Sequence, residues 1–168
     1  NDFIGVEVHR PGVGHLLSRV HAAKLTNVRV YSHDAVEVLD RCIADAALDE
    51  LVIQFPDPWH KKRHNKRRLV QPALAARAVR VLKPGGRLLL ATDWADYAWH
   101  MRDVVEGSPR FDNPHVGRLA DPGDPDVDPE GARGGFAPRF EGRTTTRFEN
   151  KGLKVERVVR DLAVTRAN

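Results

Sequence analysis

The sequence predicts an α/β fold, with a mostly parallel sheet, helices on both of its faces and an antiparallel last strand. Short β-branched runs alternate with amphipathic stretches, as expected of βαβ units. Acidic residues lie near the end of one strand-like run and just after the next three. The closing run, residues 155–164, alternates imperfectly between apolar and polar side chains, which suits a strand near the edge of a sheet.

In the first part of the chain, β-branched runs predict strands, and apolar residues at helical spacing predict helices. The expected strands are 3–8, 28–31 and 51–55, and the expected helices are 11–26 and 34–44. Asp34 is expected to cap the second helix. Cys42 is expected in the core, on the inward side of that helix with Val38, Leu39 and Ile43, because free cysteine is usually buried.

The second part continues the alternation and then breaks it. The expected elements are a helix over 70–82, a turn at 83–86, a strand over 87–92 and a helix over 93–105. The proline-rich residues 107–143 predict a long loop with one edge strand near Phe111. A short helix over 144–151, ended by Gly152 as a left-handed cap, is expected before the last strand.

Composition limits the class of protein. The 168 residues include 27 Lys and Arg and 23 Asp and Glu, a net charge of +4. One cysteine excludes an intrachain disulfide framework, and no apolar run approaches the ~20 residues of a membrane span. No signal peptide is visible, so we expect a cytoplasmic protein that does not bind membranes. We expect no metal site, since His15 and His21 are six residues apart rather than four.

The four strand-end acids are Glu7, Asp34, Asp57 and Asp93. Ligands of open α/β sheets bind at the carboxyl ends of the strands, and such acids can bind a ribose or an adenine amine. Alternatively, each acid only caps the helix that follows it. Four acids at equivalent positions favour a nucleotide-type ligand.

Residues 55–68 combine an acid, an aromatic ring and a dense basic run. Asp57 lies between two prolines, and Trp59 offers a face on which a base could stack. Six of the eight residues from Lys61 to Arg68 are cationic, which fits a surface that follows nucleic-acid phosphates. A solvated basic loop or a localisation signal is the alternative.

Five segments give the chain a specific resemblance. They are residues 3–14 (FIGVEVHRPGVG), 33–39 (HDAVEVL), 55–61 (FPDPWHK), 91–94 (ATDW) and 146–149 (TRFE). In this order they resemble the tRNA (guanine-N7-)-methyltransferase family. The resemblance implies a single Rossmann-like class I methyltransferase domain over 1–168, S-adenosyl-L-methionine as cofactor and tRNA as partner. It also implies methyl transfer to N7 of the variable-loop guanine at position 46, and we expect a monomer.

The resemblance also implies residue roles. Asp57 would be the catalytic acid and, with Glu7, Asp34 and Ala35, would bind the cofactor. The guanosine would contact Lys61, Asp93, Thr146, Arg147, Phe148 and Glu149. The tRNA phosphates would contact Arg63, His64, Asn65, Lys66, Arg67 and Arg68. The glycine-rich loop and first strand of this family precede the position of Glu7, so we expect the chain to start inside the domain.

The chemistry can be argued separately from the resemblance. Guanine N7 carries an exposed lone pair and needs no deprotonation before it attacks a sulfonium methyl group, so alignment is the main task. Methylation leaves a cationic purine, which nearby carboxylates stabilise. Whether Asp57 also acts as a general base stays open. An RNA-binding module without cofactor chemistry and a small-molecule methyltransferase are the alternative functions.

Overall fold

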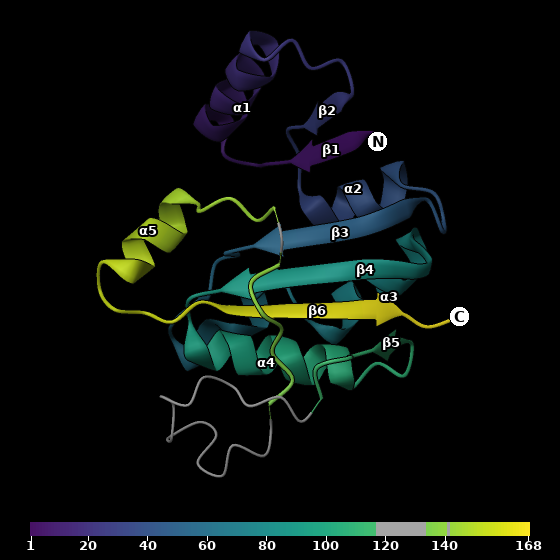
Figure 1. The fold of residues 1–168 in the computed structure, drawn as a ribbon, viewed down its shortest axis with the longest axis vertical. Coiled ribbons are helices and arrows are strands. Elements are labelled where there is room, and N and C mark those ends of the chain that lie inside the picture. Colours follow the sequence, from purple (N-terminus) through teal and green to yellow (C-terminus); the bar gives the residue numbers. More distant parts are fainter. Residues whose placement is uncertain (117–133, 141) are drawn as a thin grey trace. The chain divides into compact units, whose positions relative to one another are not determined.

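The computed structural model describes residues 1–116, 134–140 and 142–168 (Figure 1). They form two compact units, residues 1–44 and 45–168. That both belong to one domain stays a prediction. The acidic stretch 121–130 of the expected long loop lies outside the described residues.

The first unit is a βαβα arrangement. β1 (Phe3–Val6) pairs in parallel with β2 (Val28–Tyr31), and α1 (Arg10–Ala22) connects them. α1 ends four residues earlier than expected, and Lys24 just beyond it adopts a left-handed φ of 52°. β2 leads into α2 (Ala35–Cys42), which Asp34 caps as expected.

Cys42 differs from its expected position. Val38, Leu39 and Ile43 are buried, but Cys42 is exposed, so the prediction of a core cysteine is wrong. α2 ends at Cys42, and Ile43 already has extended backbone angles (φ −111°, ψ 120°). Helical spacing therefore no longer predicts which side chains point inward at this end.

The second unit is built on a four-stranded sheet in the order β3-β4-β6-β5. β3 (Leu48–Gln54) runs parallel to β4 (Leu82–Thr92). β6 (Arg160–Arg166) pairs antiparallel with β4, and β5 (Phe111–Asp112) pairs antiparallel with β6 at the edge. The α/β class, the antiparallel last strand and the edge strand near Phe111 are confirmed.

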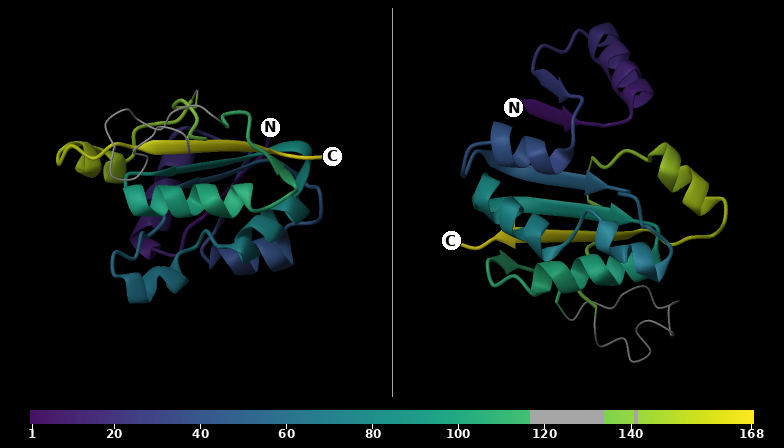
Figure 2. Two further views of the ribbon diagram at one scale, coloured as in Figure 1. Left: turned by 90° about the horizontal axis from the view of Figure 1, so that it is seen from below. Right: turned by 180° about the vertical axis from the view of Figure 1, so that it is seen from behind.

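Two helices cover one face of this sheet. α3 (Pro72–Val81) and α4 (Ala95–Glu106) pack side by side beneath β4 and β6 (Figure 2). Residues 88–91 of β4, between two neighbouring strands, are each at most 2% exposed. Their uninterrupted apolar run is typical of a strand buried on both faces. No helix in the described parts of the chain is long and apolar enough to span a membrane.

The last third of the chain departs from the expected boundaries. α5 covers Arg147–Leu153, and the last strand begins at Arg160 rather than 155. Gly152 is a buried residue inside α5 and not a left-handed cap. A Cβ atom at Gly152 would lie 2.5 Å from Asp93 Oδ2, so α5 here closely approaches the residue that follows β4. The expected turn at 83–86 is an irregular part of β4, with Gly85 at φ 77°.

Candidate functional site

The strand ends of the second unit bring two of the expected acids to neighbouring positions. Gln54 of β3 pairs with Ala91 of β4, and the Phe55 amide donates to the Ala91 carbonyl at 2.8 Å. Asp57 and Asp93 therefore follow adjacent parallel strands at the same edge of the sheet. Asp57 is exposed, whereas the side chain of Asp93 is 16% exposed.

The loop that carries Asp57 is strained and locally braced. Phe55 and Trp59 have left-handed φ angles of 49° and 47°, which non-glycine residues rarely adopt. Asp57 Oδ1 accepts a hydrogen bond from the Trp59 amide at 3.0 Å. Backbone strain of this kind persists where surrounding contacts enforce it, and it is frequent at functional sites.

Arg68 is one of those enforcing contacts. Its side chain is 2% exposed, and its Nε donates to the Pro58 carbonyl at 2.9 Å. Its Nη2 donates to the Asp96 carboxylate, and its guanidinium lies 4.7 Å from the centre of the Tyr97 ring. Burial raises the pKa of Tyr97. Although the sequence places Arg68 at the end of the basic run, the structure turns its side chain into the protein.

The rest of the basic run forms an exposed turn. η1 (Lys62–Arg67) is a 3₁₀ helix, and the cations of the run other than Arg68 are exposed. The Arg67 guanidinium lies 5.0 Å from the centre of the Trp59 ring. The His64 ring lies edge-on to the same Trp59 ring, with 5.9 Å between the ring centroids. The ring expected to stack on a base is thus already covered in part. Asn65 is half-buried, and its carbonyl accepts from Gln71 Nε2 at 3.0 Å.

Asp93 lies among residues from three parts of the chain. Arg157 Nη1 donates to Asp93 Oδ2 at 3.1 Å, and its guanidinium lies 5.0 Å from the Trp94 ring centre. The His60 ring approaches Trp94 to 4.2 Å between centroids. Together with Gly152, these contacts join the end of β4 to α5 and to the loop after β3.

The 146–149 segment begins α5. Thr146 caps the helix, because its Oγ1 accepts from the Glu149 amide at 3.1 Å. Arg147 and Phe148 are exposed, and Phe148 is 63% exposed. Glu149, by contrast, is buried at 3% exposure. The structure thus presents three of these expected guanosine contacts at the surface or partly so, and buries the fourth.

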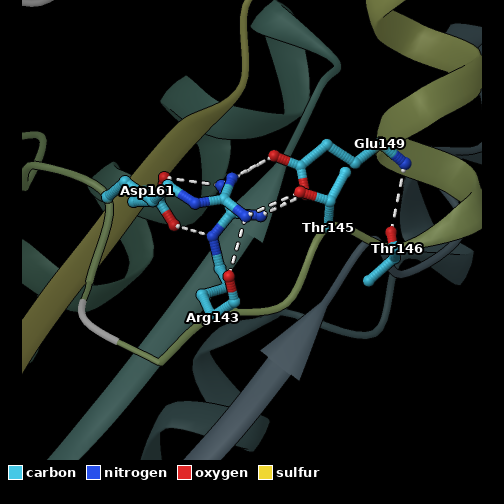
Figure 3. A network of polar contacts seen from close by, with 6 residues as sticks. Arg143, Thr145, Thr146, Glu149 and Asp161 are labelled. Atoms are coloured by element: carbon cyan, nitrogen blue, oxygen red, sulfur yellow. Dashed lines mark hydrogen bonds and ion pairs between the residues drawn. The ribbon is translucent and has the colours of Figure 1, made fainter.

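Glu149 belongs to an ionic network that the sequence does not predict (Figure 3). Arg143 donates to both Glu149 oxygens, at 2.9 and 3.0 Å, and its Nε lies 2.9 Å from Asp161 Oδ1. Burial raises the pKa of Glu149, but hydrogen bonds from Arg139 and Arg143 outweigh it, and the net pKa is lowered. Burial raises the pKa of Asp161. The T-x-x-E pattern at 146–149 indicated a helix start, but no local signal indicated Arg143 or Asp161.

In the first unit, Glu7 and Asp34 follow the neighbouring parallel strands β1 and β2. Glu7 Oε1 accepts from the His9 amide at 2.8 Å, and a Cβ atom on Gly12 would lie 3.3 Å from Glu7 Cγ. Asp34 Oδ1 accepts from two α2 amides, at 2.8 and 3.2 Å. Asp34 is thus a helix cap at an exposed strand end, with Ala35 as the first residue of the helix.

Known proteins resemble the chain in sequence and in fold. A family model described as "Putative methyltransferase" matches residues 1–127. The tRNA (guanine-N(7)-)-methyltransferase of Ectopseudomonas mendocina is 51% identical over 98% of this chain and 63% of its own length. The protein of that name from Xanthomonas oryzae pv. oryzae is also 51% identical, over 98% of this chain and 59% of its own length. The chain spans less than two thirds of these relatives.

Among solved structures, a SAM-dependent O-methyltransferase from Thermotoga maritima aligns with a TM-score of 0.53. The alignment covers 100% of this chain and 51% of that protein at 16% identity, so it supports the fold alone. The expected Rossmann-like class I methyltransferase fold is thereby confirmed. By the match of the family model over residues 1–127, the chain belongs to this methyltransferase family.

Proposed function

We propose that the protein transfers a methyl group from S-adenosyl-L-methionine to N7 of guanine in tRNA. The observation that carries the proposal is the position of Asp57 and Asp93 at adjacent strand ends, with the exposed basic turn η1 a few residues after Asp57. The names of relatives that are 51% identical to this chain support tRNA as the substrate and guanine N7 as the methylated atom. Since tRNA is the proposed substrate, we expect the protein to act in the cytoplasm.

The residues of the first unit fit a nucleoside-bearing cofactor. Glu7 and Asp34 follow neighbouring parallel strands, the position at which α/β sheets bind nucleotides. In the proposal, the Glu7 carboxylate accepts from the ribose hydroxyls, and Asp34 with the Ala35 backbone binds the adenine. S-adenosyl-L-methionine, when bound, supplies the methyl group as part of a sulfonium ion.

The carboxylates of the second unit fit guanine. Asp57 and Asp93 would accept hydrogen bonds from the guanine N1–H and amino group, which adenine cannot offer in that pattern. Their negative charges would stabilise the purine cation that forms as N7 takes the methyl group. Lys61 and the 146–148 segment would hold the nucleoside, so that N7 points at the methyl carbon. Asp93 would exchange its bond with Arg157 for bonds to the base.

The exposed cations of the basic turn would hold the tRNA backbone. Arg63, Lys66 and Arg67 are exposed, as a phosphate-binding surface requires, and His64 and Asn65 lie among them. Arg68 is assigned a different role, because its buried guanidinium is bonded to the Asp57 loop and to Asp96. We propose that Arg68 supports that loop and does not contact phosphate.

Methyl transfer from labelled S-adenosyl-L-methionine to bulk tRNA tests the activity. The product nucleoside should be 7-methylguanosine, and transfer to another atom or to small molecules alone would contradict the proposal. Replacing Arg63, Lys66 and Arg67 together by Ala should make the slope of log K for tRNA binding against log salt concentration shallower, by about 0.7–0.9 per lost phosphate contact. A triple Ala variant at Arg19, Lys24 and Lys83 removes the same charge from exposed positions elsewhere and serves as the control.

A further inference from the structure

Arg143 is the centre of a buried network that joins three separate parts of the second unit (Figure 3). Its side chain is 1% exposed. It donates to both oxygens of Glu149 in α5, and it forms an ion pair with Asp161 in β6. Nη2 also donates to Asp161 Oδ2 at 3.3 Å. One guanidinium therefore fixes the start of α5 against the last strand.

The same guanidinium reaches the loop of Asp57. Its carbon lies 5.8 Å from the centre of the Phe55 ring and 5.7 Å from that of Phe140. Phe55 is the strained residue two positions before Asp57. The 146–149 segment and the Asp57 loop, which are distant in sequence, thus contact the same buried side chain.

The carboxylate of Glu149 has little capacity left for a ligand. Arg143 bonds to both of its oxygens, Arg139 bonds to Oε1, and the residue is 3% exposed. The network pairs two cations, Arg139 and Arg143, with two anions, Glu149 and Asp161. A buried charge is stable only when it is paired and hydrogen-bonded, so these four side chains depend on one another.

We propose that Arg143 is a positioning residue that sets the 146–148 segment against the Asp57 loop, and that Glu149 acts through Arg143 rather than by contact with the base. This rests on the proposed function, because the residues it positions are those assigned to guanosine. Sites of this kind lose rate steeply when their supporting side chains loosen, since alignment within about 1 Å is required.

The test compares Arg143→Lys, Arg143→Gln, Glu149→Gln and the double variant Arg143→Gln/Glu149→Gln in the whole protein. Lysine keeps the charge but cannot form the paired bonds to Glu149 together with the contact to Asp161. Lys151→Gln removes an exposed charge from the same helix and is the matched control. The readouts are the single-turnover rate of methyl transfer, the dissociation constant for tRNA, and hydrogen exchange of amides 144–153.

Each single Arg143 variant should lower the single-turnover rate by about 100-fold, the cost of a misplacement of roughly 1 Å. Binding of tRNA should change by less than about threefold, because the exposed phosphate-binding cations are intact. Exchange at 144–153 should accelerate in both Arg143 variants, and Lys151→Gln should match the wild type in all three readouts. The double variant should be no slower than the slower single variant, as expected of residues that act as a unit.

Additive losses in the double variant would overturn the proposal, because Glu149 would then act independently of Arg143. Unchanged exchange at 144–153 in both Arg143 variants would overturn it as well. Hydrogen exchange needs no substrate, so this outcome is separate from the activity. A wild-type protein that methylates no tRNA would instead refute the proposed function, while the exchange result would still decide whether Arg143 holds the segment.

Discussion

Replacing Arg68 by Ala should destabilise the protein without weakening its salt-dependent contact with tRNA, and replacing Arg63 by Ala should do the reverse. The two arginines lie five residues apart in one basic run. Arg63 is exposed, whereas the Arg68 side chain is 2% exposed and bonded to Pro58 and Asp96. The pair therefore separates a structural role from the proposed RNA-binding role within a single motif.

The magnitude follows from the contacts of Arg68. Loss of its hydrogen bond leaves the Pro58 carbonyl unpaired, at about 1–3 kcal/mol. Loss of the cation–π contact with Tyr97 adds about 1 kcal/mol. The ion pair with Asp96 adds at most about 1 kcal/mol, because the Asp96 side chain is 69% exposed. Together these give about 3 kcal/mol, a fall in Tm of about 6–12 °C for a protein of this size.

The assay is thermal unfolding of the whole protein, followed by tRNA binding at several salt concentrations. Arg63→Ala should stay within about 0.5 kcal/mol of the wild type in its free energy of unfolding. It should also lower the steepness of the salt slope, the slope of log K for tRNA binding against log salt concentration, by about 0.7–0.9. Arg68→Ala, measured below its Tm, should keep the slope. Arg68→Lys should also lose most of the stabilisation that the Arg68 contacts provide, because an ammonium cannot reproduce the fork geometry of the guanidinium. An Arg68→Ala variant with wild-type Tm and a lower salt slope would refute the reasoning.

Three further predictions concern the site. Asp57→Asn should keep the Tm and tRNA affinity but slow single-turnover methyl transfer at least ~100-fold, and a near-wild-type rate would remove Asp57 from the chemistry. Gly152→Ala should raise the KM for tRNA, since its Cβ atom would lie 2.5 Å from Asp93 Oδ2, and an unchanged KM would show that α5 can shift at no cost. Thr146→Ala should cost about 1 kcal/mol in urea unfolding, because the Glu149 amide loses its cap, whereas Thr146→Ser should restore it.

The order of the elements and the position of the acids could be predicted from the sequence. The β-branched runs and helical spacings are local patterns, and they indicated β1 to β4, the helices between them and the antiparallel last strand. Asp57 and Asp93 were placed by the same logic, because an acid just after a parallel strand must lie at that edge of the sheet. The five motif segments also indicate a methyltransferase, and the family model described as "Putative methyltransferase" matches residues 1–127.

The environments of Arg68, Arg143 and Asp161 were decided by the tertiary structure alone. Arg68 resembles its basic neighbours in sequence, yet Asp96, which pairs with it, lies 28 residues away. Arg143 and Asp161 are 18 residues apart, and Gly152 of α5 packs closely against Asp93, which follows β4. The spacing of residues in the sequence predicts which side chains share one face of a helix or strand. Whether a charge ends in solvent or in a buried pair depends on which distant side chain folds against it, because only such a partner can offset the cost of desolvation.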